Sequence, residues 1–166
     1  MRKKEKSEHP KVIAIHPARS CGPCTACCDG WVRGTIRGHE MMPGTPCHFR
    51  QEITDNCGCS IYKDRPRDPC RNFVCEWLAA DSPFPDSFRP DLLKVIITRL
   101  RWRNTRPFML IPAGRPTDPA LLQWMRDLAL RTGQPLVYEE HGNRVGFGPP
   151  EFTEAVRRGG LGGLGN

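Results

Sequence analysis

The sequence predicts an α+β protein in which an irregular cysteine-rich module is followed by a small antiparallel sheet packed on one or two helices. Two observations predict this arrangement. All nine cysteines lie between positions 21 and 75 of the 166 residues, and the second half of the chain has none. That second half alternates β-branched runs with one well-capped helical stretch, which is typical of a small layered fold.

The net charge of +7 is spread unevenly along the chain. Residues 1–20 carry six Lys or Arg against two Glu, so we expect a flexible basic arm, with a candidate short strand at 12–15. Residues 21–80 form the predicted cysteine module, which is neutral while its thiols are protonated. A basic excess concentrated in a tail is only weak evidence for nucleic acid binding.

The compartment decides between two explanations of the thiols. The first nine residues are charged, no apolar stretch follows them, and no run is long enough to span a membrane. We therefore expect a cytoplasmic protein without membrane association. In a reducing compartment, and with an odd number of cysteines, metal ligation is favoured over the disulfide framework of small secreted domains.

The stretch Cys21-Gly-Pro-Cys24-Thr-Ala-Cys27-Cys28 places four thiols in eight residues. Close C-x-x-C pairs aim both sulfurs at one metal ion or one corner of a cluster. The spacing begins like a bacterial ferredoxin motif, but Cys28 follows at once and breaks that pattern. Because adjacent side chains point in different directions, we expect Cys27 and Cys28 to serve two different centres. A single site with surplus thiols is the alternative.

The cysteines that follow lie in two further segments. Cys47 comes after a loop-rich segment with candidate strands at 31–33 and 35–37, and we expect the neighbouring His48 to be structural rather than a ligand. Asp68 and Pro69 resemble an N-cap and a first helical residue, which predicts a helix over about 69–80.

In that predicted helix, Cys70 falls in the first turn, and Cys75 lies about 140° further around the axis. This again points toward two centres. Phe73 and Trp77 are then spaced to cover the site from water, and they also suit ordinary core positions.

Four motifs in this order carry a family resemblance: C-x-x-C-x-x-C-C at 21–28, C-H-F at 47–49, G-C-S-I-Y-x-x-R-P at 58–66 and C-R-x-F-x-C-x-W at 70–77. The chain resembles the cysteine-cluster proteins of the YkgJ type, described as zinc- or iron-chelating domains. The resemblance implies eight metal ligands, which fall here on Cys21, Cys24, Cys27, Cys28, Cys47, Cys59, Cys70 and Cys75. Cys57 is extra, either as a thiol outside the sites or as an alternative ligand.

The resemblance also bears on the metal. All-sulfur ligation suits an iron–sulfur cluster as well as two zinc ions. Flagellin lysine methyltransferases are similar in this module and are thought to use an iron–sulfur cluster for methyl transfer, so we expect a cluster here and keep two Zn²⁺ as the alternative. Their activity is not carried over, because the resemblance ends near residue 78. Lys63, Arg65 and Arg71 lie among the ligands and either offset their charge or form a solvated face.

Two functions follow as expectations. The first is an iron–sulfur protein with a redox, cluster-carrying or methyl-transfer-like role. The second is a structural zinc-binding module that interacts with a protein or nucleic acid partner. Whether the protein is an enzyme stays open, since the sequence has no Gly-rich phosphate loop, G-x-S-x-G or H-E-x-x-H motif.

Beyond the module, residues 81–86 read as a linker and 81–158 as an α+β region packed on the module. In the β-rich segment 92–102, Arg99, Arg101 and Arg103 alternate along one predicted strand face, which would bind phosphates or an acidic partner, or pair with Glu139 and Glu140. The further expected elements are a strand at 108–111, a helix from Asp118 to Gly133 with Leu121, Trp124, Met125 and Leu128 on its apolar face, a hairpin of 136–139 with 144–147, a helix at 150–158, and a disordered Gly-rich tail at 159–166.

Overall fold

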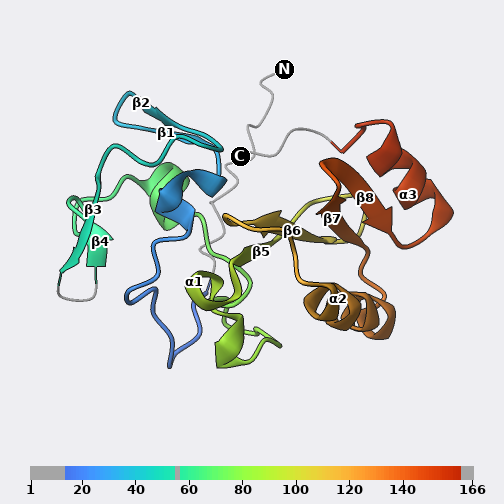
Figure 1. The fold of residues 1–166 in the computed structure, drawn as a ribbon. Helices are drawn as coiled ribbons and strands as arrows, with labels where there is room; N and C mark the ends of the chain where they lie inside the picture. Colours follow the sequence, from blue (N-terminus) through green and yellow to red (C-terminus); the bar gives the residue numbers. More distant parts are fainter. Residues whose placement is uncertain (1–13, 55–56, 162–166) are drawn as a thin grey trace, which may run out of the picture.

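The structure, a computed structural model, describes residues 14–54 and 57–161. Figure 1 shows the cysteine-rich half on one side and a four-stranded sheet with its helices on the other. The mixed α and β content of the prediction is confirmed. In the described part of the chain, no helix has the length and apolarity required to cross a bilayer.

The cysteine-rich half is built from short elements. Its regular parts are two antiparallel hairpins and two five-residue π-helical segments: β1 (Gly34–Ile36), β2 (His39–Met41), β3 (Arg50–Thr54), β4 (Cys57–Cys59), η1 (Cys27–Trp31) and η2 (Arg67–Arg71). The β1–β2 turn has two consecutive left-handed residues, Arg37 and Gly38, as tight hairpins require. The strand predicted at 35–37 is therefore largely confirmed, whereas 31–33 joins η1 to β1.

The helix predicted over 69–80 is wrong. Only η2 forms there, and Asp68 within it is extended, at φ −106° and ψ 134°. The Asp68 carboxylate accepts a hydrogen bond from the Asn72 side chain, at 2.5 Å, instead of capping backbone N–H groups. Downstream, the Glu76 amide donates a hydrogen bond to the Ile97 carbonyl of the sheet, at 2.8 Å. The chain is thus drawn out of a helical path by a bond to a distant strand.

The predicted linker is also part of the body of the protein. Phe84 is 2% exposed and packs against the rings of Phe88 and Trp124. Two short turns follow it, η3 (Asp86–Phe88) and α1 (Pro90–Leu93). The Pro-Phe-Pro sequence at 83–85 is therefore a turn packed against the core through Phe84, and not an exposed linker.

The four-stranded sheet has the order β5–β6–β7–β8. Its strands are β5 (Val95–Arg99), β6 (Phe108–Pro112), β7 (Leu136–Glu140) and β8 (Asn143–Phe147). The sheet is mixed and not antiparallel as predicted, because β6 and β7 run parallel while the two outer pairs are antiparallel. The reason is the helix between β6 and β7, which carries the chain back to the starting end of the sheet.

That helix is α2 (Pro119–Thr132), and it confirms the prediction closely. The Asp118 carboxylate accepts from the Ala120 amide at 2.8 Å, and Gly133 ends the helix at φ 65°. Leu121, Met125 and Leu128 are buried, so the apolar stripe faces the sheet as amphipathic spacing requires. Trp124 is only partly buried, in the aromatic group with Phe84.

The last helix, α3 (Pro150–Arg157), packs on β8 and on the sheet face opposite α2. Phe152 and Val156 meet Met109 and Val137 there in a small second apolar cluster. The predicted hairpin of 136–139 with 144–147 is confirmed as β7 and β8.

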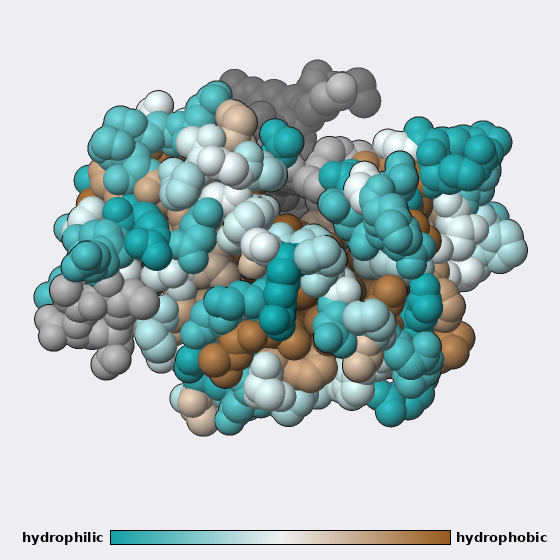
Figure 2. Space-filling view, in the orientation of Figure 1, coloured by the Kyte–Doolittle hydropathy of each residue, from teal (hydrophilic) through white to brown (hydrophobic). Residues whose placement is uncertain are grey.

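The main apolar core joins the two halves of the molecule. It includes Cys75 and Trp77 from the module together with Ile96, Phe108 and Met125 from the sheet and α2. The cysteine-rich half alone has a buried cluster of only Ile36, Met41 and Cys47. The visible face is largely hydrophilic, with apolar side chains reaching it around α1 and α2 (Figure 2).

Part of the predicted basic arm is bound to the protein. Ile15 forms a β-bridge with Ala79. The Arg19 guanidinium donates to the carbonyls of Trp77 and Phe84 at 2.7 and 2.8 Å. Residues 1–13 of the arm and 162–166 of the predicted disordered tail lie outside the described residues.

Replacing Asp118 with Ala tests the cap of α2. We expect a loss of about 1 kcal/mol in the free energy of unfolding, because the Ala120 amide loses its acceptor. Urea unfolding followed by circular dichroism measures it, with the exposed Asp81→Ala as the control. Equal stability of Asp118→Ala and Asp81→Ala would contradict the assignment of the cap.

Candidate metal centres

Four of the predicted ligands gather beside the main core: Cys21, Cys24, Cys27 and Cys75. The turn Cys21-Gly-Pro-Cys24 is closed by a hydrogen bond from the Cys24 amide to the Cys21 carbonyl, at 2.9 Å. Burial raises the pKa of Cys27 well above its usual range, and Cys75, Cys28, Cys24 and Cys21 raise it further by charge repulsion. We call this set the first cysteine group.

Cys75, at the other end of the module sequence, has two of the same neighbours, Cys21 and Cys24. Burial raises the pKa of its thiol to about 11, and Cys21 and Cys24 contribute further repulsion. Cys21 and Cys24 also pack against the main core, which contains Cys75 itself. The first cysteine group therefore lies where the module meets the sheet.

The other four predicted ligands form a second cysteine group: Cys28, Cys47, Cys59 and Cys70. Burial raises the pKa of Cys28 to about 12, and Cys47, Cys59 and Cys70 are its next strongest influences. Cys70 in turn has its pKa raised first by burial and then by Cys47 and Cys59. The Cys47 amide donates to the Cys28 carbonyl at 2.8 Å, which ties two members through the backbone.

The structure thus divides the eight residues at two points, between Cys27 and Cys28 and between Cys70 and Cys75. In η1 the backbone turns sharply at Gly30, at φ 86° and ψ 37°. The pKa of Cys27 is raised by burial and then by Cys75, Cys28, Cys24 and Cys21, so Cys27 has neighbours in both groups, whereas Cys28 has Cys47, Cys59 and Cys70. Of the two adjacent cysteines, only Cys28 packs beside Cys47 in the small module cluster. The ninth cysteine, Cys57, has a side chain outside the described residues.

The two groups have the composition of metal sites without a converged geometry. Within residues 14–54 and 57–161, no set of three or more His, Cys, Asp or Glu side chains lies close enough to hold a metal ion as it stands. Cys24, Cys27, Cys28, Cys47, Cys70 and Cys75 are thiols and not disulfides. Burial raises the pKa of Cys24, Cys27, Cys28, Cys70 and Cys75, so the protonated form of these thiols is favoured until a cation replaces the proton.

Aromatic side chains shield the first group. Trp77 is 6% exposed, and Phe73 packs against the same core that contains Cys75. The Arg19 guanidinium lies 4.9 Å from the centre of the Trp77 ring. Sequence reasoning placed Arg19 in a flexible arm and missed this role, because its partners lie some sixty residues further along the chain.

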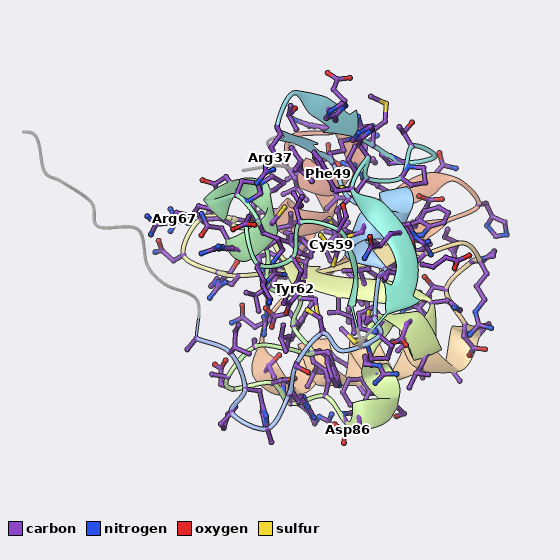
Figure 3. All side chains as sticks on the ribbon, turned by 90° about the vertical axis from the view of Figure 1, so that its left-hand side faces the viewer. Arg37, Phe49, Cys59, Tyr62, Arg67 and Asp86 are labelled. Atoms are coloured by element: carbon purple, nitrogen blue, oxygen red, sulfur yellow. The ribbon has the colours of Figure 1, made fainter. Side chains whose placement is uncertain are left out.

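The second group is nearer the solvent, and Figure 3 shows its Cys59 near Tyr62, with the basic residues Arg37 and Arg67 further toward the outside. Cys59 is partly exposed, and Tyr62 is 39% exposed. The Arg65 guanidinium stacks 3.8 Å from the Tyr62 ring centre, and its charge counteracts the rise in the pKa of Cys70. Arg71 donates to the Lys63 carbonyl at 3.0 Å. Of the three basic residues singled out, Arg65 thus partly offsets the rise that burial causes in the pKa of a thiol, that of Cys70.

His48 lies against another imidazole. Its ring stacks on His39 with centroids 3.7 Å apart and planes 3° from parallel, and both rings meet Phe49 edge-on. This face-to-face contact fixes His48 beside the β1–β2 hairpin, in keeping with a structural role.

The three-arginine strand face is not formed. β5 ends at Arg99, and Arg103 lies in a left-handed turn at φ 49° with its guanidinium over Trp102. The Arg99 side chain pairs with Glu76 at 2.8 Å, and not with Glu139 or Glu140 as the sequence suggested. Alternation in the sequence implied a longer strand than the fold permits.

Gly30 lies where the segment that carries Cys28 passes close to the Thr45–Pro46 backbone just before Cys47. Replacing Gly30 tests whether this close approach is made. A Cβ added there would lie 2.8 Å from the Thr45 carbonyl carbon and 2.9 Å from Pro46 N. Gly38 has nearly the same φ, 84° against 86°, but nothing within 4 Å of an added Cβ. We expect Gly38→Ala to cost about 1 kcal/mol, from backbone strain alone, and Gly30→Ala about 3 kcal/mol or more, from strain plus the clash.

Urea unfolding of the two variants side by side measures the difference. Since φ is matched, the excess cost of Gly30→Ala reports the close approach of the Thr45–Pro46 backbone. Equal costs would show that this approach is not made in solution.

No protein-family model matches the chain, and neither a curated protein nor a solved structure matches it.

Proposed function

We propose that the protein binds metal at two centres, the first held by Cys21, Cys24, Cys27 and Cys75 and the second by Cys28, Cys47, Cys59 and Cys70. The observation that supports this most is the division of eight buried or half-buried thiols into two sets of four. Four sulfur ligands are the number that zinc and iron–sulfur clusters take in proteins.

The chemistry of the donor set fits such an ion. Thiolates need a cation or hydrogen bonds when they are buried, and a metal replaces the thiol protons and provides that charge. The Arg65 guanidinium next to Cys70 adds positive charge at the second centre. Binding would require the sulfurs of each group to converge further, around the turns at Gly22 and Gly30.

For the occupant we propose an iron–sulfur cluster, on the resemblance to the YkgJ-type family, with a redox, cluster-carrying or methyl-transfer-like role. A bound cluster supplies one-electron chemistry or a Lewis-acidic iron. The chain's own contribution is to exclude water with Phe73 and Trp77 at the first centre and to leave the second near the surface. Whether this makes an enzyme depends on the occupant.

A structural zinc module is the second candidate, and a specific observation favours it. The first group is part of the core that joins module and sheet, where a closed four-sulfur zinc site would act as a structural link. In that case the protein serves to present a surface to a protein or nucleic acid partner.

Purification without oxygen, followed by metal and sulfide analysis, separates the two. A brown protein with acid-labile sulfide supports the cluster, and a colourless protein with about two zinc ions per chain supports the zinc module. A chain that contains neither metal and keeps its fold in a strong chelator would refute both.

Serine substitution at Cys27 and Cys28, one at a time, tests the division into two centres. We expect each variant to lose about half of the bound metal, because only one four-sulfur set is broken in each. Spectra of the remaining metal should differ between the two variants. Cys57→Ser is the matched control and should keep all of it. If both variants lose the same metal and spare the rest, the division is wrong.

A further inference from the structure

A groove of about 560 Å³ runs between the cysteine module and the sheet. One wall comes from the module, with Trp31 to Arg33 after η1 and Asn72 to Val74 after η2. The floor and the other wall come from the sheet and from the loop between β5 and β6. This size is within the range of small-molecule sites in proteins, and the proposed metal centres do not use it.

The floor of the groove is apolar. Met109 on β6 and Val137 on β7 point to the face opposite α2, where Phe152 and Val156 of α3 cover them and leave only 6% and 2% exposed. The apolar surface open to the groove therefore comes mainly from the half-buried Leu100, Ile111 and Phe73. Ile111 continues this strip along β6, and Leu161 closes it from the end of the described chain. Phe73 adds an aromatic side chain from the module wall. A hydrocarbon body could therefore be buried against sheet and module at once.

The rim of the groove is cationic. Its exposed arginines are Arg33, Arg101, Arg106 and Arg144. In the described part of the chain, no carboxylate lies within ion-pair distance of any of these four guanidinium groups.

Two acidic residues also line the groove, and they do not neutralise this rim. Glu76 is occupied by Arg99 at 2.8 Å. Glu139 lies opposite Arg144 in the β7–β8 register, without a salt bridge. The groove therefore has more guanidinium groups than carboxylates to pair with them, and guanidinium groups suit the paired oxygens of a carboxylate or phosphate.

We propose that this groove binds a small amphipathic anion, with its carboxylate or phosphate held by the arginine rim and its hydrocarbon body on the apolar floor around Ile111, Leu100 and Phe73. The bounded volume and the apolar floor favour a small molecule over an acidic protein segment. Among the residues that the structure describes, no cysteine lines the groove, but Phe73 borders both the groove and the first proposed metal centre. The test therefore uses the protein as purified, with its metal content measured alongside.

Decanoate and decyl phosphate are suitable probes, with decanol and acetate as the matched controls that lack either the charge or the hydrocarbon. Methyl NMR spectra of the protein give a site-specific readout at Met109, Ile111 and Val137. We expect saturable shifts of these methyl groups with the two amphipathic anions, and much weaker binding of decanol and acetate. The stronger of the two anions identifies the head group.

Two variants locate the head group. Arg101→Gln combined with Arg106→Gln should weaken binding about tenfold or more, since two charge-assisted contacts are lost. Arg33→Gln, on the opposite wall, should weaken it as well. Arg131→Gln is the control, because this exposed residue lies on α2, which covers the other face of the sheet. Metal content and circular dichroism should be unchanged in all of them.

Three results would overturn the proposal. Decanol binding as tightly as decanoate would show that the arginines have no role. Methyl shifts that ignore the Arg101 and Arg106 substitutions would place the ligand elsewhere. A glutamate-rich peptide that binds the groove when decanoate and decyl phosphate do not would replace the small molecule with an acidic protein partner.

Discussion

The cysteine-rich half depends on one constraint, the enclosure of eight thiols, of which Cys47 and Cys75 are buried and the other six half-buried. Apart from the thiols, the only buried residues of its own small cluster are Ile36 and Met41, far too little apolar area to order some sixty residues. Burial raises the pKa of Cys27 and Cys75 in the first group and of Cys28 and Cys70 in the second, so the protein keeps these thiols neutral or pairs them with positive charge. Short hairpins, glycine turns and prolines are the elements that bring such side chains together without a large core.

The first group lies at the contact between the cysteine-rich half and the sheet. Cys75 and Trp77 belong to the same core as Ile96 and Phe108, and the Glu76 amide bonds to the edge of β5. Three members of the second group, Cys28, Cys47 and Cys70, pack instead in the small cluster of the module itself. This group lies toward the solvent, with Arg65 and Tyr62 on its rim. The two groups therefore differ in their surroundings although they have identical donor sets.

What the sequence predicted well was governed by local chemistry. Helix α2 has its cap, its proline and its terminal glycine within the helix ends themselves, and the β7–β8 turn needs only His141 and Gly142 in left-handed conformations. The split at Cys27 and Cys28 was also suggested by local geometry, that of adjacent residues, but it stays a prediction. These signals are contained in a few neighbouring positions, so they can be read without the fold.

What the sequence did not reveal depends on distant partners. Residues 72–80 leave a helical path because Glu76 bonds to β5, and the parallel pairing of β6 with β7 follows from the route of α2. The groove likewise combines Trp31, Phe73 and Met109 from three separate segments. From the sequence alone, each of these residues has a plausible local role, and nothing indicates that they line the same groove.

The backbone pairing of Ile15 with Ala79 has a consequence for the mechanics of the cysteine-rich half. The Ala80 amide bonds to the Ala14 carbonyl at 3.0 Å, so the two ends of residues 14–80 lie side by side. A pulling force applied at these two positions would load the backbone hydrogen bonds between them before it reached any cysteine turn. The bridge is thus a mechanical clamp across the base of the module.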